Sequence, residues 1–113
     1  MSGSAAIRHW RAQRVSALAL IPLALWLVES LLAHLGSDRV QIQTWLGQPV
    51  PAVLAAALVI VTFFHLGLGV RVVLEDYVHT PGRLAVALVA NRVACWALAL
   101  IALAAIATLA FGL

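Results

Sequence analysis

The sequence predicts an all-α integral membrane protein with three transmembrane helices. Apolar residues make up 65% of its 113 residues and charged residues only 10%, whereas soluble domains carry about a quarter charged residues. Three apolar runs each reach the roughly 20 residues that a helix needs to cross a bilayer. They occupy 15–35, 50–74 and 84–113. We therefore expect one membrane domain over 1–113, with no room for a soluble catalytic domain.

The positions of the arginines predict the orientation of this domain. All seven basic residues are arginine: Arg8, Arg11 and Arg14 precede the first apolar run, Arg71, Arg83 and Arg92 surround the second loop, and Arg39 lies alone in the first loop. Because positive residues gather in cytoplasmic loops, we expect a cytoplasmic N-terminus and second loop and a periplasmic C-terminus. Membrane topology accounts for the net charge of +3, so no nucleic-acid partner is expected.

The first transmembrane helix is expected at approximately 13–35. The small and polar stretch 1–6 before it is predicted to be disordered. His9 is interpreted as a residue of the cytoplasmic membrane interface. At the outer end, Glu29 and His34 are interpreted as rim residues that can reach water.

The first loop is expected at 36–50. Gly36 is suited to end the first helix, because glycine readily adopts the backbone conformation of a C-terminal cap. Pro49 and Pro51 are suited to begin the second helix, where the missing N–H group costs nothing. That helix is expected at approximately 51–76.

Most of the polarity within the apolar runs lies in 65–77, with the sequence HLGLGVRVVLEDY. At about 100° per residue, His65, Gly69 and Asp76 fall on one face of a helix. At about 1.5 Å per residue, His65 lies roughly 16 Å deeper in the membrane than Asp76. Ionisable residues inside a membrane are costly, and this stripe is therefore a candidate functional site.

A third helix is expected at approximately 84–112, after a turn at Thr80-Pro81-Gly82. Asn91 and Arg92 interrupt its inner end and leave two possibilities. Either the helix begins near residue 93, or the arginine reaches the interface while Asn91 bonds a neighbouring helix. Cys95, the single cysteine, is interpreted as a packing residue, since it alone can form neither an internal disulfide nor an iron–sulfur site.

The imidazole of His65 has the chemistry of an axial ligand for haem iron. The glycines Gly67 and Gly69 beside it would let a flat haem, or equally another helix, approach closely. Haem propionates are anionic, and Arg14 is the first candidate to pair with them because Arg71 points about 120° away from the His65 face. Each feature also has a simpler interpretation, namely a hydrogen bond within a helix bundle, helix packing, or contact with lipid phosphate.

Asp76 and Tyr77 form a second candidate site at the end of the same helix. A tyrosine hydroxyl can donate a hydrogen bond to a quinone carbonyl, and a neighbouring carboxylate can orient it or relay a proton. By themselves, the two residues are more typical of a membrane-interface tyrosine beside a helix-ending acid.

The spacing H-x10-D-Y, filled by His65, Asp76 and Tyr77, and the string HWRAQRVSALALIPL at 9–23 carry a resemblance to a known family. The chain resembles the D-type hydrophobic membrane anchor of succinate dehydrogenase (respiratory complex II), in its alphaproteobacterial form. Length, helix number and N-terminal orientation agree, so the resemblance covers nearly the whole chain.

The resemblance implies a heterotetramer in the bacterial inner membrane. A flavoprotein subunit oxidises succinate, an iron–sulfur subunit carries the electrons, and a C-type cytochrome b anchor shares haem b and the ubiquinone site with this chain. It implies that His65 is a haem axial ligand, that Tyr77 bonds ubiquinone with Asp76 beside it, and that Arg14 holds a haem propionate. The chain has no flavin or cluster motif, so we expect no catalytic residue of succinate oxidation in it.

Two other functions remain open at this point. The first is a small proton-coupled transporter that uses Glu29 as its coupling carboxylate. Such exporters usually need four helices per subunit and have no need for His65 or Tyr77. The second is a purely structural membrane assembly subunit, which has no need for these residues either.

Overall fold

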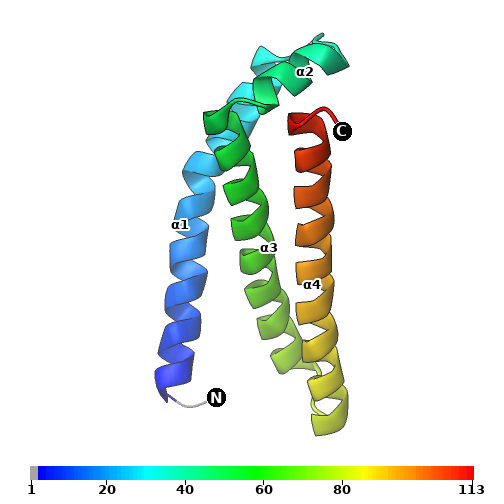
Figure 1. The fold of residues 1–113 in the computed structure, drawn as a ribbon. Helices are drawn as coiled ribbons and strands as arrows, with labels where there is room; N and C mark the ends of the chain where they lie inside the picture. Colours follow the sequence, from blue (N-terminus) through cyan, green and yellow to red (C-terminus); the bar gives the residue numbers. More distant parts are fainter. Residues whose placement is uncertain (1–2) are drawn as a thin grey trace.

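The computed structural model describes residues 3–113, which form four helices (Figure 1). These are α1 (Gly3–Ala33), α2 (Arg39–Leu46), α3 (Pro49–Tyr77) and α4 (Pro81–Ala110). Helices α1, α3 and α4 are long and apolar enough to cross a membrane, so the prediction of three spans is confirmed. Residues 1 and 2 of the stretch expected to be disordered lie outside the described residues, whereas its other four residues belong to α1.

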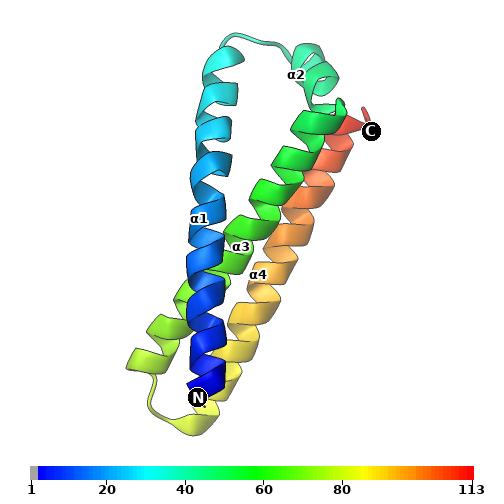
Figure 2. The same cartoon turned by 90° about the vertical axis from the view of Figure 1, so that its left-hand side faces the viewer.

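Helix α3 is the central element of the bundle. It packs against α1 on one side and α4 on the other, while α1 and α4 do not contact each other within the described chain. Figure 2 shows α1 diverging from α3 toward the end that carries α2. The start of α1 and the 78–80 loop lie at one end of the molecule, and α2 and the C-terminus lie at the other (Figure 1). This arrangement agrees with a shared side for the N-terminus and the second loop; which side is cytoplasmic stays a prediction.

The long helices begin and end at recognisable signals. Pro49 and Pro81 occupy first-turn positions of α3 and α4, where proline loses no helical hydrogen bond. Helix α3 extends to Tyr77, so Asp76 and Tyr77 are its last residues. Helix α4 is continuous from Pro81 onward, which excludes a helix start near residue 93.

The first loop contains a short helix that was not predicted. Asp38 caps α2: its carboxylate accepts from the Gln41 N–H at 2.8 Å, and its own N–H donates to the Gln41 side chain at 2.9 Å. This reciprocal pair is a capping box, a signal already visible in the D-x-x-Q spacing. The Trp45 ring lies 5.9 Å from that of Trp26 and 4.2 Å from that of His34, between ring centroids. These contacts fix α2 against α1 and give His34 a packing role.

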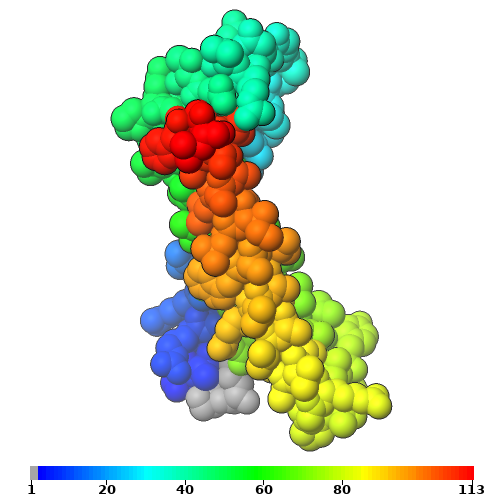
Figure 3. All heavy atoms as spheres, turned by 45° about the vertical axis from the view of Figure 1, so that its right-hand side comes forward, coloured from blue at the N-terminus to red at the C-terminus, as the bar shows by residue number. Residues whose placement is uncertain are grey.

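Most of the apolar surface stays uncovered. Among the described residues, only Leu46 and Ala99 are buried hydrophobic residues. The molecule is slender, with extents of 51 × 26 × 21 Å (Figure 3). A chain of this shape cannot enclose a core of its own, so its stability must come from lipid and from packing against other helices.

Candidate functional site

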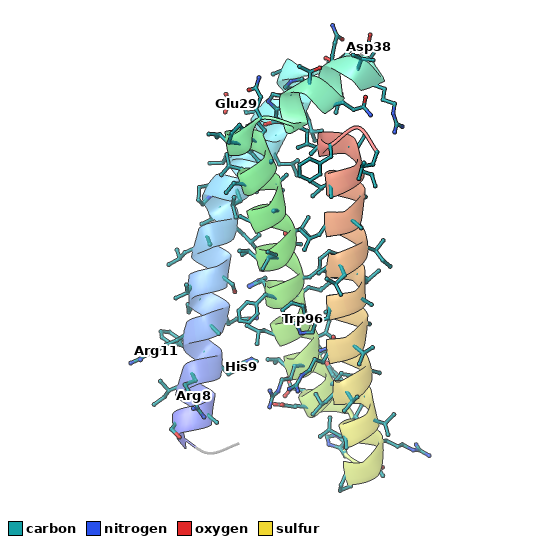
Figure 4. All side chains as sticks on the ribbon, viewed as in Figure 1. Arg8, His9, Arg11, Glu29, Asp38 and Trp96 are labelled. Carbon is teal, nitrogen blue, oxygen red and sulfur yellow. The ribbon has the colours of Figure 1, made fainter. Side chains whose placement is uncertain are left out.

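Three polar side chains of α1 lie on the face that contacts α3. His9, Gln13 and Ser16 follow the spacing i, i+4, i+7, which places them on one helical face. Figure 4 shows His9 directed toward α3, whereas Arg11 points away from it. Ser16 is only 5% exposed, and its Oγ lies 2.8 Å from Nδ1 of His65 on α3. We call His9, Gln13, Ser16 and His65 the α1–α3 polar seam.

His65 is half-buried and presents its two ring nitrogens to different surroundings. Nδ1 is engaged by Ser16. Nε2 has no hydrogen-bond partner among the described residues, and it is not one of the enclosed polar atoms. One nitrogen therefore holds the ring in place, while the other is accessible to a group from outside this chain.

Two further polar atoms of the seam are enclosed without a partner within the described chain, namely His9 Nε2 and Gln13 Oε1. An open hollow of about 290 Å³ lies beside His9 and is lined by Ala5, Arg8, His9, Leu68 and Arg71. Sequence reasoning assigned His9 to the membrane interface and missed Gln13 and Ser16. Their common spacing was the signal that could have revealed a polar face directed into the protein.

The two glycines near His65 serve helix contacts on opposite sides of α3. A Cβ added to Gly69 would lie 3.8 Å from the Gln13 side chain of α1, and one added to Gly67 would lie 3.5 Å from Cys95 Sγ of α4. Of the two possibilities left open by the sequence, the structure therefore shows approach by another helix at both positions.

The arginines near the seam differ in their partners. Arg71 Nε donates to Glu75 Oε1 at 2.7 Å, one helical turn further along α3. Arg14 is exposed and makes no ion pair within the described residues. Arg14 thus remains available to an anion outside this chain, while Arg71 already has a carboxylate.

Asp76 and Tyr77 lie at the end of α3, away from His65. Both are exposed, and Tyr77 retains 79% of its surface. Tyr77 follows His65 by twelve positions, which corresponds to about 18 Å along the helix axis. The structure therefore separates the sequence-predicted residues into two places, a seam within the bundle and a tip at its end.

A second hollow, of about 310 Å³, lies between α3 and α4 and has Asn91 and Trp96 in its wall. Asn91 Nδ2 donates to the Gly67 carbonyl at 2.9 Å, so Asn91 does bond the neighbouring helix. Cys95 Sγ donates to Asn91 Oδ1 at 3.5 Å, which agrees with a packing role. Within residues 3–113, no cluster of three or more His, Cys, Asp or Glu side chains could hold a metal ion.

Comparison with known proteins decides the family. The model of the succinate dehydrogenase/fumarate reductase transmembrane subunit matches residues 2–111. The chain belongs to this family. A succinate dehydrogenase hydrophobic membrane anchor subunit of Rickettsia bellii is 37% identical over 78 residues, 68% of this chain and 62% of that protein. The corresponding subunit of Paracoccus denitrificans is 32% identical over 104 residues, 92% of this chain and 79% of that protein.

These relatives confirm the resemblance to alphaproteobacterial anchor subunits. The aligned part spans less than two thirds of the Rickettsia bellii relative, at 62% of its length. No solved structure matches this chain. With three membrane-length helices, this family member is a multi-pass protein of the bacterial inner membrane. The family membership favours the anchor over the transporter alternative built on Glu29, which is exposed on α1.

Proposed function

We propose that this chain is a membrane anchor subunit of succinate dehydrogenase that contributes to a haem b site and to the site of ubiquinone reduction. Its partners are a flavoprotein, an iron–sulfur subunit and a C-type cytochrome b anchor. The chain performs no succinate oxidation itself. It holds the soluble pair at the membrane and supplies side chains where electrons leave the complex.

The observation that carries this proposal is the different bonding of the two ring nitrogens of His65. Its imidazole lies inside a membrane-spanning helix, its Nδ1 is bound by Ser16 at 2.8 Å, and its Nε2 has no partner within the described chain. Leaving such a nitrogen unbonded in a membrane is costly. A ligand-binding role for Nε2 removes this cost.

The residues present fit haem b. Haem iron is bound by the porphyrin and needs only one axial nitrogen from each side, so a single histidine is sufficient without a cluster of ligands. His65 would hold the iron through Nε2, with the second axial ligand from the C-type partner. When bound, haem accepts and donates single electrons. The uncovered apolar faces of α1 and α3 provide the surroundings that the partner helices would complete.

Asp76 and Tyr77 would form part of the ubiquinone site at the tip of α3. The Tyr77 hydroxyl donates a hydrogen bond to a quinone carbonyl, and the neighbouring carboxylate of Asp76 orients that hydroxyl or relays a proton. Their exposure at the tip of α3 supports a site that an iron–sulfur subunit completes. We place this tip on the cytoplasmic side, in keeping with the arginine distribution.

The test of the function is to produce the chain with and without its three proposed partners. We expect co-production to give a complex that retains all four subunits and shows a low-spin haem spectrum on reduction. Produced alone, the chain should bind no stable haem, because three helices with so few buried residues cannot enclose it. A stable haem-loaded monomer or homodimer would contradict the proposal.

Arg14 is expected to neutralise a haem propionate. Arg14→Leu removes a charge-assisted hydrogen bond worth roughly 1.5–3 kcal/mol, so haem should be retained less well or its reduction potential should change. The measurement is the haem-to-protein ratio and a redox titration of the purified complex. Arg11→Leu is the matched control, because Arg11 is an exposed arginine of the same helix that points away from α3 (Figure 4). Equal behaviour of the two variants would leave Arg14 a topology determinant only.

A further inference from the structure

The contact between Ser16 and His65 joins two helices through residues 49 positions apart in the chain. Ser16 Oγ lies 2.8 Å from His65 Nδ1 and also 3.1 Å from the carbonyl oxygen of Gln13, in its own helix. The serine is 5% exposed, so water has little access to compete for these bonds. The hydroxyl is thus held between two fixed neighbours.

Proton counting assigns the direction of the two bonds. A serine hydroxyl carries one proton and two acceptor lone pairs. If that proton went to His65, two oxygen acceptors, Ser16 Oγ and the Gln13 carbonyl, would face each other at 3.1 Å with no proton between them. If the hydroxyl donates to the Gln13 carbonyl, Oγ can accept from Nδ1–H, and all three atoms are satisfied.

This direction has a consequence for the other ring nitrogen. A neutral imidazole carries one proton, so a proton on Nδ1 leaves Nε2 with a free lone pair. Nε2 is also the atom without a partner inside the described chain. The tautomer selected by Ser16 is therefore the one that can bind a metal through the accessible nitrogen.

We infer that Ser16 is a positioning residue for the haem ligand: it fixes the tautomer and the orientation of His65 and makes Nε2 a stronger donor to iron. This inference rests on the proposed function, because it requires His65 to be an axial ligand. Hydrogen bonds from the second nitrogen of a ligating histidine orient the ring and raise its basicity. A more basic ligand favours the oxidised iron, so Ser16 lowers the reduction potential of the haem.

The test uses the assembled complex with Ser16→Ala, Ser16→Thr and, as matched control, Ser30→Ala. Ser30 is also a buried serine of α1, at 9% exposure, and lies toward the opposite end of the helix. The readouts are the haem reduction potential and the low-spin signals in electron paramagnetic resonance. We expect Ser16→Ala to weaken the preference for oxidised iron by up to about tenfold, which equals ~59 mV for one electron, and to shift the resonance signals.

Ser16→Thr keeps the hydroxyl, so it should have the reduction potential and resonance signals of the parent. Ser30→Ala should also have the parent potential and signals. If Ser16→Ala loses haem altogether, recovery in Ser16→Thr and normal binding in Ser30→Ala support the inference. Parent-like potential and signals in Ser16→Ala overturn it, as does an equal change in Ser30→Ala or a failure of Ser16→Thr to restore the parent state. His65→Ala separates the two levels. Unchanged haem in that variant removes His65 from the haem site and so refutes the part of the proposed function on which this inference rests. Haem loss in His65→Ala, together with parent-like potential and signals in Ser16→Ala, refutes only the role of Ser16.

Discussion

Replacing His65 by alanine is expected to abolish or fundamentally change the haem spectrum of the assembled complex. The substitution removes the imidazole in the middle of α3. Its Nδ1 is bound by Ser16, and its Nε2 has no partner within the described chain. If His65 is a haem ligand, its removal would leave the iron without one of the two ligands that a low-spin spectrum requires. The measurement is the reduced-minus-oxidised spectrum of complex purified through a partner subunit, with the four subunits verified to be present.

His34→Ala is the matched control for this experiment. His34 is also a half-buried histidine, in the turn directly after α1, but its Nδ1 bonds the Ser30 carbonyl at 2.8 Å and its ring packs on Trp45. It lies near α2, at the opposite end from the proposed site, and its loss should leave the spectrum intact. An unchanged spectrum in His65→Ala would remove His65 from the haem site. Electron transfer from the cluster to quinone need not stop in this variant, so activity alone is no substitute for the spectrum.

Replacing Tyr77 by phenylalanine is expected to lower the ubiquinone reductase rate at least tenfold, equivalent to about 1.4 kcal/mol of barrier. The substitution keeps the ring and removes only the hydroxyl. A hydrogen bond from that hydroxyl to a quinone carbonyl would strengthen as the quinone oxygen gains negative charge, so it would stabilise the transition state more than the bound substrate. The measurement compares ubiquinone reduction with succinate oxidation by an artificial soluble acceptor.

Succinate oxidation with the soluble acceptor should be retained in Tyr77→Phe, and so should haem. Trp10→Phe is a suitable control, because Trp10 is an aromatic residue at the same end of the molecule, 64% exposed, whose N–H group is likewise lost. It should leave both rates unchanged. Equal ubiquinone kinetics in Tyr77→Phe and the parent would make Tyr77 an interfacial anchor rather than a quinone ligand.

Local signals predicted several elements correctly. Proline at the start of α3 and Gly36 after α1, with φ +80°, occupy the positions expected of them. The helix α2 was missed because its eight residues carry no long apolar pattern, although the capping box at Asp38 and Gln41 was present. Helix α1 begins at Gly3 rather than near Gln13, because a helix can continue past the apolar run that identifies a membrane span.

The sequence by itself determined the number of spans, the family and the placement of His65, Asp76 and Tyr77 on one helix. Bilayer thickness sets the length of an apolar run, and helical geometry sets the spacing along one element. The tertiary structure alone decided which helices meet, and thereby which partners His65, Gly67 and Gly69 obtain. Helices that are apolar on all sides carry no pattern that says which face turns toward a neighbour. The contact between Ser16 and His65 depends on that rotation, and only the packed bundle reveals it.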